Sequence, residues 1–473
     1  MRLDIQALRA VAVATVVVYH LVPSILPGGF VGVDVFFVIS GFLITLHLIE
    51  RPPTTGSDLL SFWARRIRRL LPASLFVLAA SVAATWALLP ETRWQSTADH
   101  ARAAALYYVN WVLQADAVDY LRMDQTPTVV QHFWSLAVEE QFYLLWPVLI
   151  LALTLLARRR YAIGLGTVVA ASLGYSVYLT ASDPAAAYFS TWTRMWELGA
   201  GGLVAVAAPM VAARLHGSRF TAGAIAVAGW IAVIASCFVI TNQTPFPGWA
   251  AVLPVMGTML IIAAQSEVKW QAWRPVQWLG DASYSVYLWH WPLLLIVPVA
   301  LEHGVGSPGR GLLDNVAIVA ATLLLSGLTK SFVEDRFRTP RWTGRRRATY
   351  ALAVAGMALV VGLASALHVV EQRGKTSAQV ALESALSRRI RASAPGPSTW
   401  SSSVLQPAGQ SSPRPPSPRT TSPSSTTIRP TAMAASPTTK TSSRWSRVSS
   451  ATRTAPSMWH SSAIRTQHSG LRR

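Results

Sequence analysis

Long apolar runs recur along this chain, each about 20 residues in length, and they leave few folds open to it. A helical run of that length spans a bilayer, because each residue of an α-helix advances about 1.5 Å. We therefore predict an all-α polytopic membrane protein with eleven spanning helices. Their expected ranges are about 5–24, 30–49, 72–90, 136–157, 161–180, 192–208, 222–241, 249–266, 282–301, 314–333 and 348–370.

The composition supports this prediction. Only 13% of the residues are charged and the mean hydropathy is +0.36, which excludes an ordinary soluble enzyme. The single cysteine, Cys237, lies inside an apolar run, which excludes a disulfide framework and a cysteine-based zinc site. We expect no metal and no permanently bound cofactor.

The net charge of +20 has two sources. Residues 391–473 hold ten Arg, one Lys and no acidic residue, in a background of Ser, Thr and Pro that cannot bury a core. The other basic residues lie in short connections between apolar runs, so we exclude a nucleic-acid partner. The predicted organisation is a membrane domain over 1–340, an eleventh helix within 341–370 and a disordered tail over 371–473.

Basic residues are unevenly shared between the two sets of connections. One set carries 18 Lys and Arg, including 158–160 and 345–347, and the other carries four: Arg93, Arg102, Arg122 and Arg310. Positive residues are retained on the cytoplasmic side. The chain is therefore predicted to have its N-terminus in the cytoplasm and its tail outside.

Ionisable residues inside a span normally face the bundle interior. Arg9 and His20 are eleven residues apart, so they share one helix face about 16 Å apart. Snorkelling of Arg9 to lipid phosphate and an interfacial role for His20 explain this pair equally well. Asp34 is the only carboxylate in its apolar run, and we expect it to pair with His20 across a short glycine turn unless it caps the second helix.

A basic cluster precedes Pro72. Arg65, Arg66 and Arg69 fall within one helical turn in the connection before the third span. Guanidinium groups bind phosphate bidentately, which suits a diphosphate donor such as coenzyme A. Lipid headgroups would account for the same charges without any ligand.

Polar residues also open the fourth span. His132, Ser135 and Glu139 fall on one helix face, with Glu140 beside them. The two glutamates also suit a helix N-terminus, and the His-Glu-x-x-His spacing of metalloproteases is absent. Further inward-facing candidates are Arg194, Glu197, Tyr284, Ser285, Tyr287, His290 and Glu334. For these, mutual neutralisation of Arg194 with Glu197 and an interfacial aromatic belt stay open as alternatives.

Four of these segments occur in an order that identifies a family. They are DIQALRAVAV at 4–13, Tyr19-His20, GVDVFFVISGFLI at 32–44 and WSLAVEEQFY at 134–143. Over about residues 1–370 the chain resembles the membrane-bound acyltransferase 3 family. The resemblance implies a bundle of about ten helices in a bacterial plasma membrane, with the family's Arg-x10-His pair on Arg9 and His20. It also implies transfer of an acyl group, most often acetyl, from acyl-CoA to a hydroxyl of an extracytoplasmic glycan, peptidoglycan or glycolipid.

Many long members of the family continue into a periplasmic SGNH hydrolase-like domain with a Gly-Asp-Ser motif. The tail of this chain has no such motif. We interpret it as an out-of-frame translation of a GC-rich gene, with a disordered extracellular stalk as the alternative. A requirement for the second domain would leave this chain inactive.

For the reaction we predict His20 as general base, with Asp34 or Glu139 orienting its ring. Arg9 would hold the phosphate or pantetheine of the donor, assisted by Arg65, Arg66 and Arg69. The rival hypothesis is a proton-coupled secondary transporter in which His20, Asp34 and Glu139 relay protons. A third is an inactive anchor that presents the basic tail to anionic cell-wall polymers.

Overall fold

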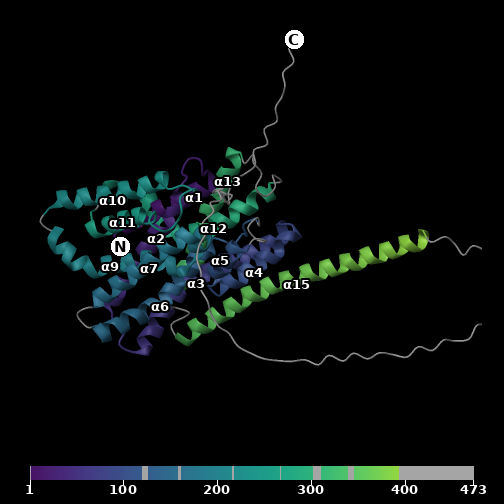
Figure 1. Cartoon of the computed structure of the whole chain (residues 1–473), viewed down its shortest axis with the longest axis horizontal. Helices are drawn as coiled ribbons and strands as arrows, with labels where there is room; N and C mark the ends of the chain where they lie inside the picture. Colours follow the sequence, from purple (N-terminus) through teal and green to yellow (C-terminus); the bar gives the residue numbers. More distant parts are fainter. Residues whose placement is uncertain are drawn as a thin grey trace, which may run out of the picture. The chain divides into compact units, whose positions relative to one another are not determined.

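The computed structural model describes residues 2–119, 126–157, 161–215, 218–266, 268–301, 311–338 and 346–393 (Figure 1). All regular structure in these residues is helical, which confirms the predicted all-α class. They fall into two units: one reaches Ser377, and the other begins at Ala378 inside the last helix. Some residues with a predicted charge or disorder lie outside the described part of the chain: Arg122, 158–160, Arg310, 341–345 and the tail from 394 onward.

The helices follow the predicted order of spans. The longer ones are α1 (Leu3–Leu21), α2 (Gly32–Glu50), α3 (Gly56–Leu88), α6 (Phe133–Ala157), α7 (Tyr161–Ser182), α9 (Thr191–Leu215), α10 (Arg219–Val239), α11 (Val252–Ala264), α12 (Arg274–Ala300), α13 (Leu312–Thr329) and α15 (Arg346–Ser393). Shorter elements are η1 (Gly29–Val31), η2 (Glu91–Arg93), α4 (Trp94–Ala105), α5 (Val109–Val118), α8 (Pro184–Phe189), η4 (Lys269–Ala272), the π-helix η5 (Lys330–Glu334) and α14 (Asp335–Arg338).

Each of the eleven predicted ranges overlaps one of these helices. Nine helices in the described part of the chain are long and apolar enough to cross a membrane, so this is a multi-pass membrane protein. The predicted spans at 192–208 and 249–266 form α9 and α11, which are not among the nine; α11 is apolar but only 13 residues long.

The prediction for 51–71 as a connection is wrong over most of its length. Helix α3 begins at Gly56, where Thr55 and Asp58 form a capping box: Asp58 N donates to Thr55 Oγ1 at 3.2 Å, and Thr55 N donates to Asp58 Oδ2 at 2.9 Å. The helix then runs through Pro72. The basic cluster therefore lies on a helix that is continuous with the span.

Two further stretches are more ordered than predicted. The connection between the third and fourth spans contains α4 and α5. Residues 371–393, assigned to the disordered tail, continue helix α15. The segment is rich in Ala, Leu, Glu, Gln and Arg, which favour a helix, and residues 372–392 are exposed.

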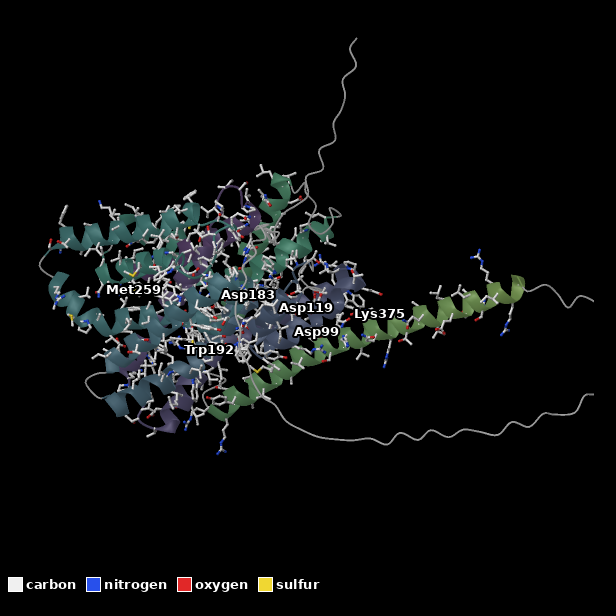
Figure 2. The ribbon with its side chains drawn as sticks, viewed as in Figure 1. Asp99, Asp119, Asp183, Trp192, Met259 and Lys375 are labelled. Atoms are coloured by element: carbon white, nitrogen blue, oxygen red, sulfur yellow. The ribbon has the colours of Figure 1, made fainter. Side chains whose placement is uncertain are left out.

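Helix α2 packs against α1, α6, α9 and α11. Its approach to α9 is close enough to require glycine on both helices: a Cβ at Gly41 would lie 1.7 Å from Leu198 O, and a Cβ at Gly201 would lie 2.0 Å from Val38 O. Side chains fill the space between the helices (Figure 2). This contact fixes α2, which lines the pocket described next.

Candidate functional site

A pocket of about 790 Å³, including the space at its mouth, lies between α1, α2, α3, α6 and α12. Its wall is mostly apolar, with Phe36 and Phe37 from α2 and Leu136 from α6. Three guanidinium groups and two carboxylates enter this wall, from Arg9, Arg66, Arg69, Glu139 and Glu334. The pocket thus combines a mostly apolar wall with more positive than negative side chains.

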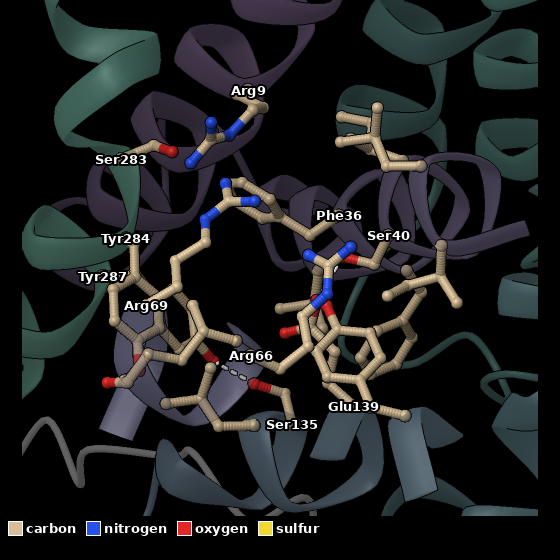
Figure 3. Close-up of a pocket in the computed structure, with 18 of the residues that line it drawn as sticks. Arg9, Phe36, Ser40, Arg66, Arg69, Ser135, Glu139, Ser283, Tyr284 and Tyr287 are labelled. Carbon is tan, nitrogen blue, oxygen red and sulfur yellow. Dashed lines mark hydrogen bonds between the residues drawn. The ribbon is translucent and has the colours of Figure 1, made fainter. Parts of the chain in front are cut away.

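The three arginines come from two helices and point into the same space (Figure 3). Arg9 of α1 is 8% exposed and donates to Gln6 Oε1 at 3.3 Å. Arg66 of α3 lies over the rings of Phe62 and Tyr143, at 5.6 and 5.7 Å from their centroids. Guanidinium groups form bidentate hydrogen bonds with carboxylate and phosphate, so this arrangement suits an anion.

Arg65 does not join them. It is exposed and outside the set of pocket-lining residues, with Nη2 3.3 Å from His47 Nε2. The sequence placed Arg65, Arg66 and Arg69 in one cluster, and the three do share an arc of about 100° on α3, with Arg65 at one edge of it. Only Arg66 and Arg69 reach the pocket with Arg9.

The pocket carboxylates are held by different means. Glu139 of α6 accepts hydrogen bonds from Ser40 and Tyr143. Glu334 ends the π-helix η5, and Ser285 donates to it at 3.3 Å. A π-turn within a helix shifts the direction of the side chains that follow it, and such turns recur at functional sites.

His20 lies outside the set of pocket-lining residues and beside other histidines instead. Its Nδ1 is 3.2 Å from Nε2 of His290, whose Nδ1 donates to Tyr287 O at 2.6 Å. Because a carbonyl only accepts, Nε2 of neutral His290 accepts from His20 Nδ1. Neutral His20 then carries its lone pair on Nε2, and the residue is half-buried.

His132 and Ser135 connect the histidines with the pocket. The rings of His132 and His290 lie 5.7 Å apart, and His132 Nε2 donates to Leu288 O at 3.1 Å. Its Nδ1 is buried and has no hydrogen-bond partner. Tyr287 donates to His132 O at 3.1 Å and lies 2.6 Å from Ser135 Oγ, which faces the pocket (Figure 3).

The expected pair of Asp34 with His20 is wrong. Asp34 Oδ1 accepts from Arg194 Nη1 at 2.9 Å, and the same nitrogen donates to Glu197 Oε1 at 2.9 Å. All three side chains are at most 1% exposed. The alternative, a cap of α2 by Asp34, is also not formed. Arg194 supplies the counter-charge because it faces α2 from α9.

Aromatic rings enclose this buried ion cluster. The Arg194 guanidinium lies 4.9 Å from the ring centroid of Phe246, 5.1 Å from that of Tyr188 and 5.4 Å from that of Trp134. Burial raises the pKa of Tyr188, which sits in α8 outside the spans, so its phenol stays neutral against the guanidinium. The cluster therefore joins α2 to α9 through buried charges.

The remaining candidates divide between the pocket and its surroundings. Tyr284 lines the pocket and donates to Leu70 O at 2.9 Å, whereas Glu140 is half-buried and outside the lining set. Sequence reasoning missed Ser40 and Tyr143, although Tyr143 lies at i+4 from Glu139. Trp291 was not singled out as a site residue either, and its ring lies 4.8 Å from that of His20. In the described part of the chain, no group of three or more His, Cys, Asp or Glu is placed to hold a metal ion.

The fold and this site define a polytopic all-α membrane protein with a cationic, apolar-walled pocket beside a histidine cluster. Residues 2–330 match the acyltransferase domain of the acyltransferase 3 family, and the chain belongs to that family. The sequence-based identification is thus confirmed.

Two similar proteins are named as O-acetyltransferases. The peptidoglycan O-acetyltransferase OatA of Listeria monocytogenes is 32% identical over 352 residues, which cover 71% of this chain and 55% of the relative. The O-acetyltransferase OatA of Staphylococcus aureus is 34% identical over 307 residues, which cover 62% of this chain and 50% of the relative. The chain spans about half the length of the curated relatives it matches. No solved structure matches it.

Proposed function

We propose that this protein transfers an acyl group, in the first instance acetyl, from acyl-CoA to a hydroxyl of a cell-envelope glycan. The observation that carries the proposal is the convergence of Arg9, Arg66 and Arg69 on one pocket that is otherwise largely apolar. Guanidinium groups suit the phosphates of coenzyme A, and apolar walls suit its pantetheine arm. No permanently bound cofactor is needed.

His20 is the proposed base. Its Nε2 carries the lone pair when the ring is neutral, and His290 fixes that tautomer. As the acceptor oxygen attacks the thioester carbonyl, the hydroxyl proton passes to His20. The carbon–sulfur bond breaks, and the thiolate of coenzyme A leaves and takes the proton from His20 to become the thiol, which returns His20 to its neutral form.

The proposed sidedness follows from the charge of the connections. The N-terminus is cytoplasmic in a bacterial plasma membrane, so Arg9 lies near the donor and His20 near the outer surface. Peptidoglycan is the proposed acceptor because the Listeria relative is named for it. The proposed path for the acyl group runs between the pocket and the histidine cluster.

The test uses the whole chain in lipid nanodiscs with isotope-labelled acetyl-CoA and muropeptides. We expect release of thiol together with label on a muropeptide hydroxyl, detected by mass spectrometry. His20→Ala should abolish the labelled product while leaving the protein in the membrane. Label on a lipid extract only would assign a glycolipid acceptor, and proton-coupled uptake of a solute without thiol release would instead identify a transporter.

A further inference from the structure

Residues 126–131, which lead into α6, are held by three side chains from other elements. Arg93 Nη1 donates to Pro127 O at 3.1 Å. Trp291 Nε1 donates to Thr128 O at 2.9 Å. His100 Nδ1 lies 2.8 Å from Thr128 Oγ1. Thr128 is therefore tied through its carbonyl to α12 and through its hydroxyl to α4.

His100 is itself oriented by a carboxylate. Its Nε2 donates to Asp116 Oδ2 of α5 at 3.0 Å. A carboxylate acceptor keeps the proton on Nε2, so Nδ1 of the neutral ring accepts from the Thr128 hydroxyl. His100 and Thr128 are 8% and 5% exposed, so water does not replace these bonds at low cost. The proposed reaction uses neither His100 nor Asp116.

Trp291, which donates to Thr128, also contacts the proposed base. The ring of Trp291 meets the ring of His20 edge to face, with centroids 4.8 Å apart and planes at 71°. A continuous series of contacts thus runs from Asp116 through His100, Thr128 and Trp291 to His20. Each contact joins buried or half-buried groups, so a shift at one end is passed along by packing.

We propose that His100 and Asp116 are positioning residues for His20, acting through Thr128 and Trp291. Holding the carbonyl of Thr128 fixes the indole of Trp291, and the indole fixes the ring plane of His20. This assignment rests on the proposed function, since it gives His20 the role of base. A base must lie within hydrogen-bond reach of the acceptor hydroxyl, and a misplacement of about 1 Å can cost about a hundredfold in rate.

Three threonine variants separate this role from general stability. Thr128→Val keeps the side-chain volume but removes the hydroxyl, whereas Thr128→Ser keeps the hydroxyl. Thr97→Val is the matched control, because Thr97 is 1% exposed on α4 and lines the same small cavity as Thr128. We expect Thr128→Val to lower kcat by about tenfold to a hundredfold with an unchanged KM for acetyl-CoA. Thr128→Ser and Thr97→Val should stay near wild type.

A double-variant cycle tests whether His100 acts through Thr128. His100→Phe keeps a ring but loses both hydrogen bonds, so alone it should lower kcat about as much as Thr128→Val. If the two residues act in series, the double variant should be no slower than either single variant. If the losses in kcat of the two single variants multiply in the double variant, the proposal is overturned. An acyl adduct on Thr128 would also overturn it, because the threonine would then be a nucleophile.

The orientation of His20 is also measured without turnover. Diethyl pyrocarbonate modifies neutral imidazoles, and peptide mass spectrometry reports the rate at His20 alone. We expect a severalfold change in that rate in Thr128→Val and none in Thr97→Val. An unchanged rate at His20 would overturn the positioning role. Absence of transfer by the wild-type protein would instead count against the proposed function, and the modification rates would still decide the positioning.

Discussion

Nδ1 of His20 lies 3.2 Å from Nε2 of His290, and the two rings are 5.3 Å apart between centroids. His290 is in turn held by the carbonyl of Tyr287. The ring of His20 is thus oriented by a second imidazole, not by Asp34 or Glu139 as the sequence suggested. An imidazole partner sets the tautomer without placing a negative charge beside the base.

His290→Leu is expected to lower the transfer rate by about a hundredfold, because it removes the acceptor that keeps the proton on Nδ1 of His20. His290→Gln offers an amide oxygen to the same nitrogen, so its transfer rate should fall less. Initial rates with labelled acetyl-CoA in nanodiscs measure both. A His290→Leu protein as fast as wild type would show that His20 needs no partner.

Arg66→Lys should raise the KM for acetyl-CoA, because a compact ammonium does not reproduce the bidentate contact of a guanidinium with phosphate. Arg65→Lys provides the matched control, since Arg65 is the neighbouring residue on α3 but is exposed outside the pocket. We expect a rise of about tenfold for Arg66→Lys, corresponding to about 1.4 kcal/mol. An equal KM for acetyl-CoA in both variants would show that the arginines of α3 do not bind the donor.

Arg9→Lys is a separate test at the other side of the pocket. Arg9 is only 8% exposed, whereas Arg66 and Arg69 are half-buried, so Arg9 is the most enclosed of the three pocket arginines. We expect weaker use of acetyl-CoA and little change in the apparent affinity for the glycan. If the variant matches wild type in both, Arg9 contacts lipid or supports the fold, and donor binding falls to Arg66 and Arg69.

The spans were predictable because each depends on local information. About 20 consecutive apolar residues define a membrane helix whatever surrounds them. The extent of α3 was not predictable, because its third and fourth turns hold four arginines and resemble a polar connection. Its helical start depends on Thr55 and Asp58, a capping box that lies outside the apolar run.

The composition of the site was predictable, but the pairing within it was not. Arg9, Arg66, Arg69, Ser135, Glu139 and Tyr284 do line one pocket. The partner of Asp34 is Arg194, 160 residues away, and the partner of His20 is His290, 270 residues away. Such pairs depend on which helices become neighbours, and a single sequence carries no record of that.

Arg194→Met is expected to destabilise the protein by about 3–5 kcal/mol, because it leaves two buried carboxylates without their counter-charge. Asp34→Asn should lower the free energy of unfolding far less, since one carboxylate, that of Glu197, then faces one guanidinium. Thermal unfolding of the detergent-solubilised proteins compares the two. If Asp34→Asn lowers the unfolding temperature more than Arg194→Met does, the charge balance of the cluster does not determine its contribution to stability.

The last prediction concerns the orientation of α10. Ser218 caps its start between Arg214 and Arg219, whereas 240–251, beyond its end, contains no Lys or Arg. The positive-inside rule therefore places Ser218 in the cytoplasm and Gln243 outside. With the buried Cys237 replaced by alanine, single cysteines at these two positions are treated in intact cells with an impermeant maleimide. We expect labelling of Gln243→Cys, and of Ser218→Cys only after the membrane is opened. The reverse pattern would put the pocket arginines on the side opposite to coenzyme A, and the proposed donor site would then have no donor.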